Sequence, residues 1–570
     1  MQTQPTFSNE VSIVLGGEAG QGIQTIETIL TRTLKASGRH VFSTKEFMSR
    51  IRGGSNSTSI RAASNRVRAY AERMDLCVLL DRDALAWLQP RISADTLVIG
   101  DPVVFEDVAG LLPLPMAELA KQVGEKIYAN AVACGFVTAL LGLEPATLET
   151  VLKGLFDHDS EVLEKNLRAA GLGRERGEAA ARQKQLSCRI EADAGIAGQL
   201  FLNGSQAVGL GAIAGGCNFI GSYPMSPSTG VLQFLAGCAE RFGIVVEQAE
   251  DEISAINMGL GSWYAGGRAM VSTSGGGLAL MGEGISLAGS MELPMVVHLA
   301  QRPGPATGLP TRTEQGDLDL ALYAGHGEFS RAILAPGTLE DAFDCARQAF
   351  ALADASQSPV IILTDQYLLD SSCNVPALPI PAAPPEHHIG ETAADYRRYL
   401  LTESGLSPRG IPGHGKGLVC LDSDEHDEAG FITERAEVRI AMVDKRLKKL
   451  ALLRGELALP HRLFGPANYQ RLLVGWGSTR PAIEEARARV DDPQTAFLFC
   501  PQIYPLTDEV KELLLRARRL IVIENNATAQ FARLIQRETG RRADADWLQY
   551  DGMPFSVENL ETRLRQEVTL

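Results

Sequence analysis

The sequence predicts an α/β protein with three lobes and mostly parallel sheets. At 570 residues, the chain is longer than the roughly 250–300 residues over which a single core grows, so several domains are expected. Helix and strand patterns alternate through the chain, and that alternation is typical of parallel strands joined by helical crossovers. The hydrophobic content of 45% and the charged content of 22% are ordinary for a soluble globular protein.

The first lobe is expected to cover residues 1–190. The short apolar run Val11–Leu15 predicts a strand, and a glycine-rich turn after it leads into a helix that begins near Ile23. Further strands of this lobe are expected at Val41–Phe42, Leu76–Leu80 and Thr96–Ile99. The polar stretch Gly171–Lys184 is expected to mark the boundary with the next lobe.

Two further lobes are expected at residues 191–372 and 465–570. The strands predicted in them are Ala269–Ser272, Met295–Leu299, Val360–Leu363, Arg471–Val474, Thr495–Phe499 and Leu520–Ile523. Between these lobes, the Pro-rich segment Asn374–Pro385 has the composition of an extended linker. Residues 373–464 are therefore predicted to be a linker and a subunit-contact region.

Charge and composition exclude several classes of function. A net charge of −15 argues against nucleic acid as the main partner. The apolar runs are shorter than the about 20 residues that a membrane helix needs, and the first ten residues lack the blocks of a signal peptide, so a cytoplasmic protein is expected. None of the 9 cysteines forms a C-x-x-C pair, so no metal or iron–sulfur site is expected in this chain, and most of the thiols should fill cores.

A basic island lies near the N-terminus of this acidic chain. Between Thr31 and Tyr70 there are nine Lys and Arg residues against one acid, Glu46. Such an island favours a polyanionic ligand, although a solvated helix face or a patch that docks an acidic subunit has the same composition.

The glycine-rich turn before the first helix is a candidate anion site, because backbone N–H groups point out of a helix N-terminus. Its spacing matches neither a P-loop nor a dinucleotide fingerprint, so ATP hydrolysis and NAD binding are poorly supported. A tight turn without a ligand is the alternative. The following segment adds guanidinium, hydroxyl and amide donors, and together they suit a phosphate-rich ligand such as coenzyme A. The candidate residues are Gly17, Gly20, Gln21, Gly22, Arg52, Gly53, Gly54, Ser55 and Asn56.

A cluster of acids precedes a predicted helix in the second lobe. Acids at a helix N-terminus complement its dipole, and that explains most of them. Glu252 differs, because its helical neighbours place it beside the small, apolar face, whereas Glu250 faces Ser254 and Asn257. A buried carboxylate needs a specific partner. The aminopyrimidine ring of thiamin is one, since a carboxyl group beside it favours the tautomer that removes a proton from the thiazolium; Glu252 is the first candidate and Glu250 the second.

Arg302 follows a predicted apolar strand, where ligands gather in parallel sheets, so it is a candidate for binding a carboxylate. A surface arginine that caps the strand is the alternative. Ser226, Thr307 and Thr311 add hydroxyl groups in Gly/Pro-rich loops, although turn formation also explains them. His298, midway along the apolar run, is predicted to be a hydrogen-bonded core histidine.

Several of these segments together resemble the α subunit of 2-oxoacid:ferredoxin oxidoreductases. The matching segments are Tyr223–Ser228, Glu250–Ile253, Thr273–Gly275, Gln301–Thr311, Glu314–Leu318 and Gly325–Phe329. Gly17–Gly22 and Arg52–Asn56 are similar to the family's γ domain, here fused ahead of the α part. The resemblance covers nearly the whole chain, and the fused arrangement is most like the 2-oxoglutarate enzyme.

The resemblance implies a role for each lobe: a γ-type domain that interacts with coenzyme A, a thiamin pyrimidine-binding domain, and a C-terminal domain like that of transketolase. It implies that Tyr223, Pro224, Met225 and Glu252 contact the thiamin pyrimidine. Arg302 would bind the 2-oxoacid carboxylate, and with Glu252 it would form the catalytic pair. Ser226, which stands where the family more often has threonine, and Thr311 would contact the substrate.

The implied reaction is CoA-dependent oxidative decarboxylation of 2-oxoglutarate to succinyl-CoA and CO₂, with electrons passed to ferredoxin. The Mg²⁺–diphosphate motif and the [4Fe–4S] ligands of the family's β subunit are missing from this sequence, so an αβ heterodimer or an (αβ)₂ assembly is expected. Arg312 is a weak candidate for the distal carboxylate. The alternatives are pyruvate, a branched-chain or an aryl 2-oxoacid, or a non-catalytic scaffold that binds coenzyme A or a nucleotide.

Overall fold

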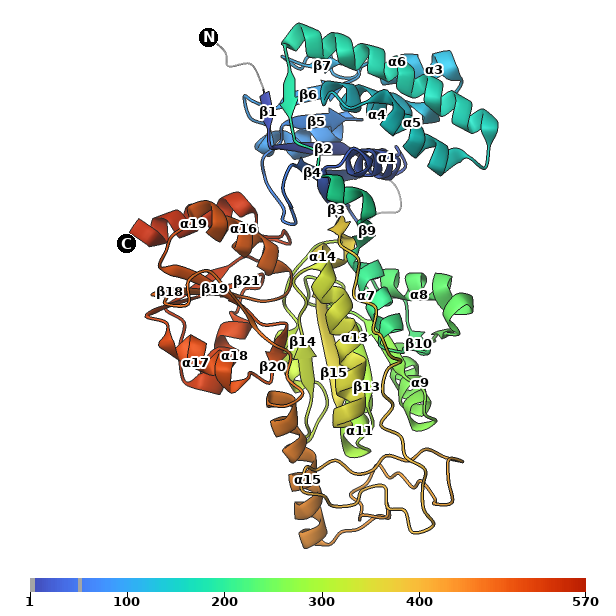
Figure 1. Cartoon of the computed structure of the whole chain (residues 1–570), viewed down its shortest axis with the longest axis vertical. Coiled ribbons are helices and arrows are strands. Elements are labelled where there is room, and N and C mark those ends of the chain that lie inside the picture. The colour runs from blue at the N-terminus through green and yellow to red at the C-terminus, as the bar shows by residue number, and fades with distance from the viewer. Residues whose placement is uncertain (1–5, 50–53, 570) are drawn as a thin grey trace. The chain divides into compact units, whose positions relative to one another are not determined.

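The computed structural model describes residues 6–49 and 54–569, which form two compact units (Figure 1). The first unit contains Met1–Leu202, Asp370–Ala377 and Ser556–Glu558, and the second contains Asn203–Leu369, Leu378–Phe555 and Asn559–Leu570. Both are α/β structures with sheets between helices, so the predicted fold class is confirmed.

The sheet of the first unit is half parallel and half antiparallel. Its strand order is β7–β6–β5–β2–β4–β3–β16–β9, with parallel pairing from β7 to β2 and antiparallel pairing from β2 to β16. The strands are β2 (Glu10–Glu18), β3 (His40–Glu46), β4 (Ser55–Ala63), β5 (Leu76–Leu79), β6 (Leu97–Gly100), β7 (Leu112–Pro113), β9 (Leu200–Asn203) and β16 (Ser372–Val375). Short strands β1 (Thr6–Ser8) and β8 (Ser187–Arg189) pair separately. The four strands predicted in this lobe are confirmed.

Helices cover this sheet and supply most of its core. They are α1 (Ile23–Ala36), α2 (Arg82–Leu88), α3 (Met116–Val123), α4 (Ala129–Leu140), α5 (Pro145–Phe156) and α6 (Ser160–Lys184). Helix α1 starts at Ile23, as predicted, because its large apolar residues recur at helical spacing and face the core. Those buried residues are Ile23, Ile26, Ile29, Leu30 and Leu34.

The prediction that Gly171–Lys184 marks a boundary is wrong. This stretch is the second half of α6, which packs along α4 inside the first unit. Glycines allow the close approach: a Cβ on Gly173 would clash with the carbonyl oxygen of Val132, and one on Gly177 would lie 2.5 Å from that of Phe136. The polar composition that suggested a boundary belongs to the exposed face of this helix.

Two alanine substitutions in α6 should therefore have opposite effects. Gly171→Ala is expected to stabilise the helix by about 0.5–1 kcal/mol, since a Cβ there meets no atom within 4 Å. Gly173→Ala should destabilise the α4–α6 pair by about 1–3 kcal/mol, because the methyl group forces the helices apart. Hydrogen exchange of the α4 and α6 amides measures both effects, and equal protection in the two variants would contradict the packing described.

The central sheet of the second unit has the order β11–β10–β12–β13–β15–β14–β20, and only β14 and β20 pair antiparallel among its described strands. The strands are β10 (Phe219–Ser222), β11 (Val245–Gln248), β12 (Ala269–Thr273), β13 (Met295–Gln301), β14 (Ala332–Leu334), β15 (Pro359–Asp365) and β20 (Gln502–Tyr504). Strands β12, β13 and β15 are buried along their whole length, which explains why the sequence showed them as continuous apolar runs.

Helices surround this central sheet (Figure 1). They are α7 (Gly204–Ala214), α8 (Thr229–Phe242), α9 (Glu252–Tyr264), α10 (Gly275–Leu280), α11 (Gly282–Ser290), α12 (Leu318–Tyr323), α13 (Leu339–Ser356) and α14 (Gln366–Asp370). Of these helices, α8, α9, α10, α11 and α13 contact the strands of the sheet.

The C-terminal sheet, also in the second unit, has the order β17–β19–β18–β21–β22. Its strands are β17 (Arg462–Phe464), β18 (Arg471–Gly475), β19 (Thr495–Phe499), β21 (Arg519–Glu524) and β22 (Ala545–Leu548), and its helices are α16 (Arg480–Val490), α17 (Asp508–Arg516), α18 (Gln530–Thr539) and α19 (Val557–Thr569). All strands predicted in the second and third lobes are confirmed. Strand β20 leaves this lobe and pairs with β14, so the two sheets are joined by backbone hydrogen bonds.

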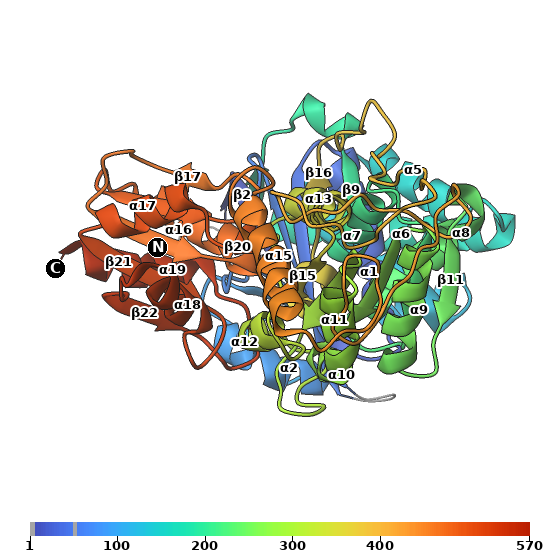
Figure 2. The ribbon, with the colours of Figure 1, turned by 90° about the horizontal axis from the view of Figure 1, so that it is seen from below.

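The predicted linker region contains a helix that the sequence did not reveal, α15 (Ala436–Arg454), seen from below in Figure 2. Buried Glu292, which precedes β13, accepts hydrogen bonds from Lys445 Nζ at 2.6 Å and also pairs with Lys449. Burial acts to raise the pKa of Glu292, but the Lys449 and Lys445 ammonium groups outweigh it and hold that pKa at about 2. This ion cluster fastens α15 to the central sheet.

Within residues 6–49 and 54–569, no helix combines the length and the hydropathy needed to cross a bilayer. Six of the nine cysteines are buried, which confirms that most of them fill cores. They are Cys77, Cys134, Cys217, Cys345, Cys373 and Cys500.

Candidate functional site

The carboxyl ends of β10, β12 and β13 bring the predicted site segments to one edge of the central sheet. Strand β10 runs directly into Tyr223, β12 ends just before α10, and β13 ends at Gln301, next to Arg302. These strands pair in parallel, so their carboxyl ends lie at the same edge. Ligand sites form at this edge in open parallel sheets.

Glu252 is the first residue of α9, and its side chain is buried, with 3% exposed. Its Oε1 atom has no hydrogen-bond partner among the residues that the structure describes. The carboxyl group lies against the first turn of α10: a Cβ on Gly277 would be 2.7 Å from that oxygen and would clash with Thr273 Oγ1. Leaving a buried carboxylate oxygen unpaired costs free energy. This arrangement fits a ligand that donates a hydrogen bond to Glu252, whereas Glu250 is exposed.

Arg302, in the loop after β13, contacts the loop after β10. Its Nη1 donates a hydrogen bond of 2.6 Å to the carbonyl oxygen of Ser226, so these two residues are brought together. Burial lowers the pKa of the Arg302 guanidinium, and the carboxylate of Asp317 acts in the opposite direction. The guanidinium is partly buried at the sheet edge, where it can bind an anionic group.

The other predicted residues of this edge differ in exposure. Tyr223 is 41% exposed, Pro224 and Met225 are half-buried, and Ser226 is exposed. The Met225 carbonyl accepts the Ser228 hydroxyl at 2.7 Å, which closes the turn before α8. Further along the loop after Arg302, Thr307 is exposed and Thr311 half-buried, and their suggested roles stay predictions.

Asp317 is a site residue to which the sequence analysis gave no role. Its Oδ2 is buried and unpaired within the described part of the chain, and a Cβ on Gly275 would lie 2.5 Å from its Oδ1. Burial first, and then the Glu314 carboxylate, raise the pKa of Asp317 to about 6, while Arg302 lowers it. The only signal for this residue was the resemblance of Glu314–Leu318 to the family.

The C-terminal lobe holds the loop that carries Asp317. Gln315 donates its backbone N–H to the Asn525 carbonyl at 2.6 Å, and its Oε1 accepts the Asn525 N–H at 2.9 Å. The Gln530 side chain donates to the carbonyl of Gly316 at 2.8 Å. Asn525 and Gln530 come more than 200 residues after the loop. The sequence offered no signal for these contacts.

His298 is fully buried, with its Nδ1 2.7 Å from Ser272 Oγ and its Nε2 2.9 Å from Thr364 Oγ1. Burial lowers the pKa of His298 to about 3. The prediction of a hydrogen-bonded core histidine is confirmed.

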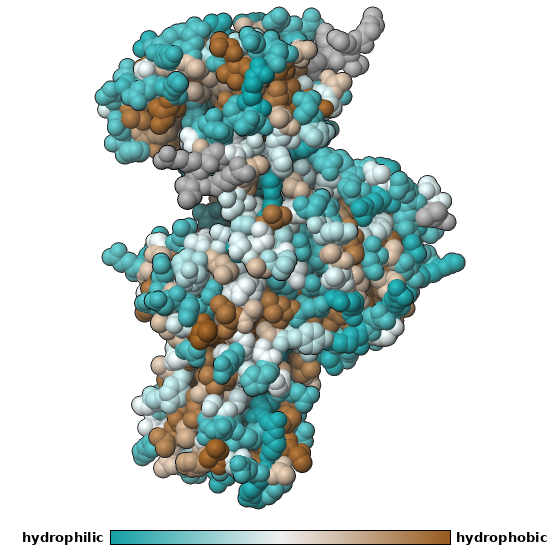
Figure 3. All heavy atoms as spheres, turned by 180° about the vertical axis from the view of Figure 1, so that it is seen from behind, coloured by the Kyte–Doolittle hydropathy of each residue, from teal (hydrophilic) through white to brown (hydrophobic). Residues whose placement is uncertain are grey.

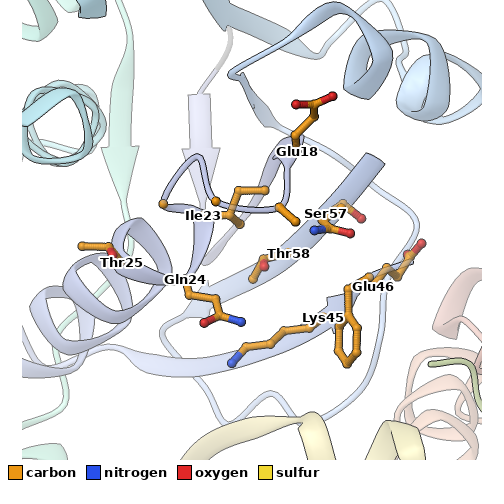
Figure 4. A pocket seen from close by; sticks show the side chains of 13 residues that line it. Glu18, Ile23, Gln24, Thr25, Lys45, Glu46, Ser57 and Thr58 are labelled. Atoms are coloured by element: carbon orange, nitrogen blue, oxygen red, sulfur yellow. The ribbon is translucent and has the colours of Figure 1, made fainter. Parts of the chain in front are cut away.

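A separate cavity of about 290 Å³ opens at the N-terminus of α1 in the first unit (Figure 4). Gly20 and Gly22 have positive φ angles of 94° and 87°, and a Cβ on Gly22 would clash with the side chain of Asn130. Figure 4 shows Gln24, Lys45 and Thr58 around this glycine turn. The lining is mixed in charge, with Glu18 and Glu46 beside Lys45.

The predicted coenzyme A residues are only partly brought together there. Gly20, Gly22 and Asn56 line the cavity. Gly17 lies in β2, Gln21 Oε1 accepts the Glu18 N–H at 3.0 Å, Gly54 directly precedes β4, and Ser55 is the first residue of that strand. Arg52 and Gly53 lie outside the described residues. In the described ranges, no three His, Cys, Asp or Glu side chains are placed to hold a metal ion.

Comparison with known families matches two long parts of the chain. Residues 12–176 match the family described as "Pyruvate ferredoxin/flavodoxin oxidoreductase", and residues 210–445 match "Pyruvate flavodoxin/ferredoxin oxidoreductase, thiamine diP-bdg". The 2-oxoacid:ferredoxin oxidoreductase 1 subunit alpha of Aeropyrum pernix is 31% identical, over 76% of this chain and 70% of that protein. The chain belongs to the family of 2-oxoacid:ferredoxin oxidoreductase α subunits.

The similarity to this family of oxidoreductases extends over nearly the whole chain. A 2-oxoacid:ferredoxin oxidoreductase subunit alpha from Sulfolobus is 29% identical over 97% of this chain and 96% of its own length. The structure is similar to that of a 2-oxoglutarate:ferredoxin oxidoreductase from Magnetococcus marinus with 2-oxoglutarate, coenzyme A and succinyl-CoA bound. The match has a TM-score of 0.92 and 29% identity, and it covers 98% of this chain and 100% of that chain. The relatives are named as α subunits, so members of this family act with a further subunit.

Proposed function

We propose that this chain is the α subunit of a thiamin diphosphate-dependent 2-oxoglutarate:ferredoxin oxidoreductase. With its partner, it would convert 2-oxoglutarate and coenzyme A to succinyl-CoA and CO₂ and pass the electrons to ferredoxin, reversibly in principle. The observation that carries the proposal is the buried Glu252, whose free oxygen faces a glycine turn at the same sheet edge as Arg302. The similarity to an enzyme that holds 2-oxoglutarate supports this choice of substrate.

In this proposal, Tyr223, Pro224, Met225 and Glu252 hold the aminopyrimidine of thiamin diphosphate. The bound cofactor supplies an electron sink for decarboxylation of a 2-oxoacid. Glu252 Oε1 would hold a shared proton against the ring, and Gly277 keeps the space beside this oxygen open. Glu252 is favoured over Glu250, because the buried position removes water that would weaken the hydrogen bond.

The substrate would lie between the loops that follow β10 and β13. Arg302 binds the 2-oxoacid carboxylate, Ser226 contacts the polar end of the substrate, and Thr311 lines the side-chain pocket. Arg312 is proposed for the distal carboxylate of 2-oxoglutarate; its Nη1 lies 3.6 Å from Met553 Sδ in the C-terminal lobe. A charged partner for that carboxylate would distinguish 2-oxoglutarate from the uncharged side chains of pyruvate or branched-chain 2-oxoacids.

A β partner would complete the site by supplying Mg²⁺ for the diphosphate and the [4Fe–4S] cluster that serves ferredoxin. Groups of hydrophobic side chains interrupt the polar surface (Figure 3). Four large, exposed hydrophobic side chains lie on the segments that carry the candidate residues. They are Tyr223, Ile253, Leu280 and Leu309, between 41% and 53% exposed. A covering subunit would bury them. The proposed assembly is an αβ heterodimer or (αβ)₂ in the cytoplasm.

The N-terminal cavity is proposed to receive coenzyme A as the second substrate. Backbone N–H groups of the turn Gly20–Gly22 and the Lys45 ammonium suit phosphate groups. Gly17, Gln21, Gly54, Ser55 and Asn56, with Arg52 and Gly53, would complete the binding segment.

Turnover of different 2-oxoacids by the purified αβ complex tests this function. With coenzyme A present and a viologen dye as acceptor, kcat/KM should be highest for 2-oxoglutarate. Dominant turnover of pyruvate or 2-oxoisovalerate would keep the chemistry and refute the substrate. A thiamin-loaded complex that turns over none of them would favour the non-catalytic scaffold.

A further inference from the structure

A second carboxyl group, that of the partly buried Asp317, lies against the same glycine turn as Glu252. The carboxyl of Glu252 faces Gly277, and both Asp317 oxygens lie close to the position that a Cβ on Gly275 would occupy. Like Glu252, Asp317 has a buried oxygen without a hydrogen-bond partner in the described part of the molecule. The proposed function uses Glu252 and leaves Asp317 without a role.

Hydrogen bonds on both sides hold the backbone of the segment that carries Asp317. The Asp317 N–H donates to Gln301 Oε1 at 3.0 Å, and the Gln301 side chain donates in turn to the Thr364 carbonyl at 3.1 Å. The preceding residues, Gln315 and Gly316, are bound by the C-terminal lobe. The backbone of Asp317 is therefore fixed between the central sheet and the C-terminal lobe.

The charged groups that face Asp317 come from each neighbouring segment. Glu314 on its own loop is a like charge, and Arg302 at the end of β13 is the cation that stabilises its ionised form. Glu252 lies across the glycine turn. Asp319, two residues further on, already pairs with Arg533 on α18. Among the described residues, Arg302 is the cation whose charge lowers the pKa of Asp317.

A carboxylate that binds to Arg302 must change the protonation equilibrium of Asp317. A substrate carboxylate neutralises the guanidinium charge and places a further negative charge near Asp317. Both effects disfavour ionised Asp317, whose pKa of about 6 already lies within reach of physiological pH. The buried position makes each effect larger than it would be in water.

We propose that Asp317 takes up one proton from solvent when a 2-oxoacid carboxylate binds to Arg302, so that substrate binding is coupled to protonation of this carboxyl group. The inference rests on the proposed function, because it assigns the substrate carboxylate to Arg302. The only bond formed at Asp317 is an O–H bond, and the neutral acid no longer repels the bound anion. Asp317 is thereby a positioning residue for the substrate.

The sign of the pH dependence follows from this coupling. Binding raises the pKa of Asp317, so the bound state holds more protons than the free state, and affinity falls as pH rises. Above pH 6, where free Asp317 is mostly ionised, one proton must be taken up for each ligand bound. Below pH 6 the group is already protonated, and affinity should become independent of pH until other groups titrate.

Competitive inhibition by glutarate in the αβ complex tests the coupling, because glutarate carries the carboxylates of 2-oxoglutarate but cannot be decarboxylated. The inhibition constant should rise by up to about tenfold per pH unit between pH 6 and 8 in the wild type. In Asp317→Asn, which keeps the shape and the backbone N–H bond, it should change less than about twofold over this range. Calorimetry of glutarate binding in two buffers of different ionisation enthalpy should show proton uptake at pH 7 in the wild type only.

Asp319→Asn is the matched control, since it removes a carboxylate two residues further on, in the first turn of α12, at a position already paired with Arg533. It should retain the wild-type pH dependence and proton uptake. An equal pH dependence in Asp317→Asn and the wild type, or a flat profile in the wild type, would overturn the coupling while leaving 2-oxoacid turnover in place. A wild-type complex that turns over no 2-oxoacid would instead refute the proposed function.

Discussion

Replacing Glu252 with glutamine is expected to lower the kcat of the αβ complex by about 10²–10⁴-fold, the usual contribution of a positioned acid or base. Glutamine preserves the size of the side chain and the packing against Gly277, but it cannot exchange a proton with a bound ring. The loss should appear in kcat with little change in KM for the 2-oxoacid, since Arg302 is untouched. Viologen reduction with saturating thiamin diphosphate measures it.

Glu250→Gln provides the control for this experiment. It removes a carboxylate two residues earlier in the same acidic cluster, but from an exposed side chain. This variant should retain turnover within about twofold of the wild type, because a solvated charge contributes little. If instead Glu250→Gln is inactive and Glu252→Gln is not, the second candidate is the residue that contacts the cofactor.

Replacing Arg302 with glutamine should raise KM for the 2-oxoacid by about 30-fold to several thousand-fold. Losing one partner of a buried charge pair costs about 2–5 kcal/mol, which corresponds to this range. Glutamine can still donate a hydrogen bond to the Ser226 carbonyl, so the contact between the two loops need not be lost. Initial rates over a range of 2-oxoacid concentrations at fixed coenzyme A measure the effect.

Arg533→Gln is a suitable comparison for the Arg302 variant, since it removes an arginine from an exposed ion pair with Asp319 in the same unit. Its KM should stay close to that of the wild type. A normal KM for the 2-oxoacid in Arg302→Gln, with normal kcat, would show that another group binds the substrate carboxylate.

The strands were predictable because each buried parallel strand is a short apolar run bounded by turn residues. Val360–Leu363 and Thr495–Phe499 lie within or coincide with the observed strands for that reason. Helix α6 was mistaken for a boundary because its glycines and charges suggest a loop in isolation. They form a helix because Gly173 and Gly177 pack on α4, a contact between segments about 40 residues apart in the sequence.

Helix α15 was missed for a related reason. Lys445 and Lys449, which are buried, look like surface residues in the sequence, so the helix shows no apolar face. Their partner is Glu292, about 150 residues earlier in the chain. A hydropathy pattern in the sequence cannot identify a helix whose buried face is held by ion pairs.

The candidate site was predictable in its chemistry but not in its geometry. Helical spacing placed Glu252 on the buried face, and the end of an apolar strand placed Arg302 at the sheet edge. Asp317 was missed as a residue with a role, since its loop follows no regular pattern. Its position depends on Gln315 and Gly316 contacting the C-terminal lobe.

The fold class, the strand positions, and the residue types that point to thiamin and a carboxylate substrate are all encoded locally in the sequence, since strand periodicity and helix faces depend on neighbouring residues. Only the folded chain shows that Glu252 has an unpaired oxygen beside Gly277, that Arg302 donates to the Ser226 carbonyl, and that the charge of Asp317 acts on the pKa of Arg302. These contacts join segments from different strands, and only the parallel sheet brings their carboxyl ends to one edge.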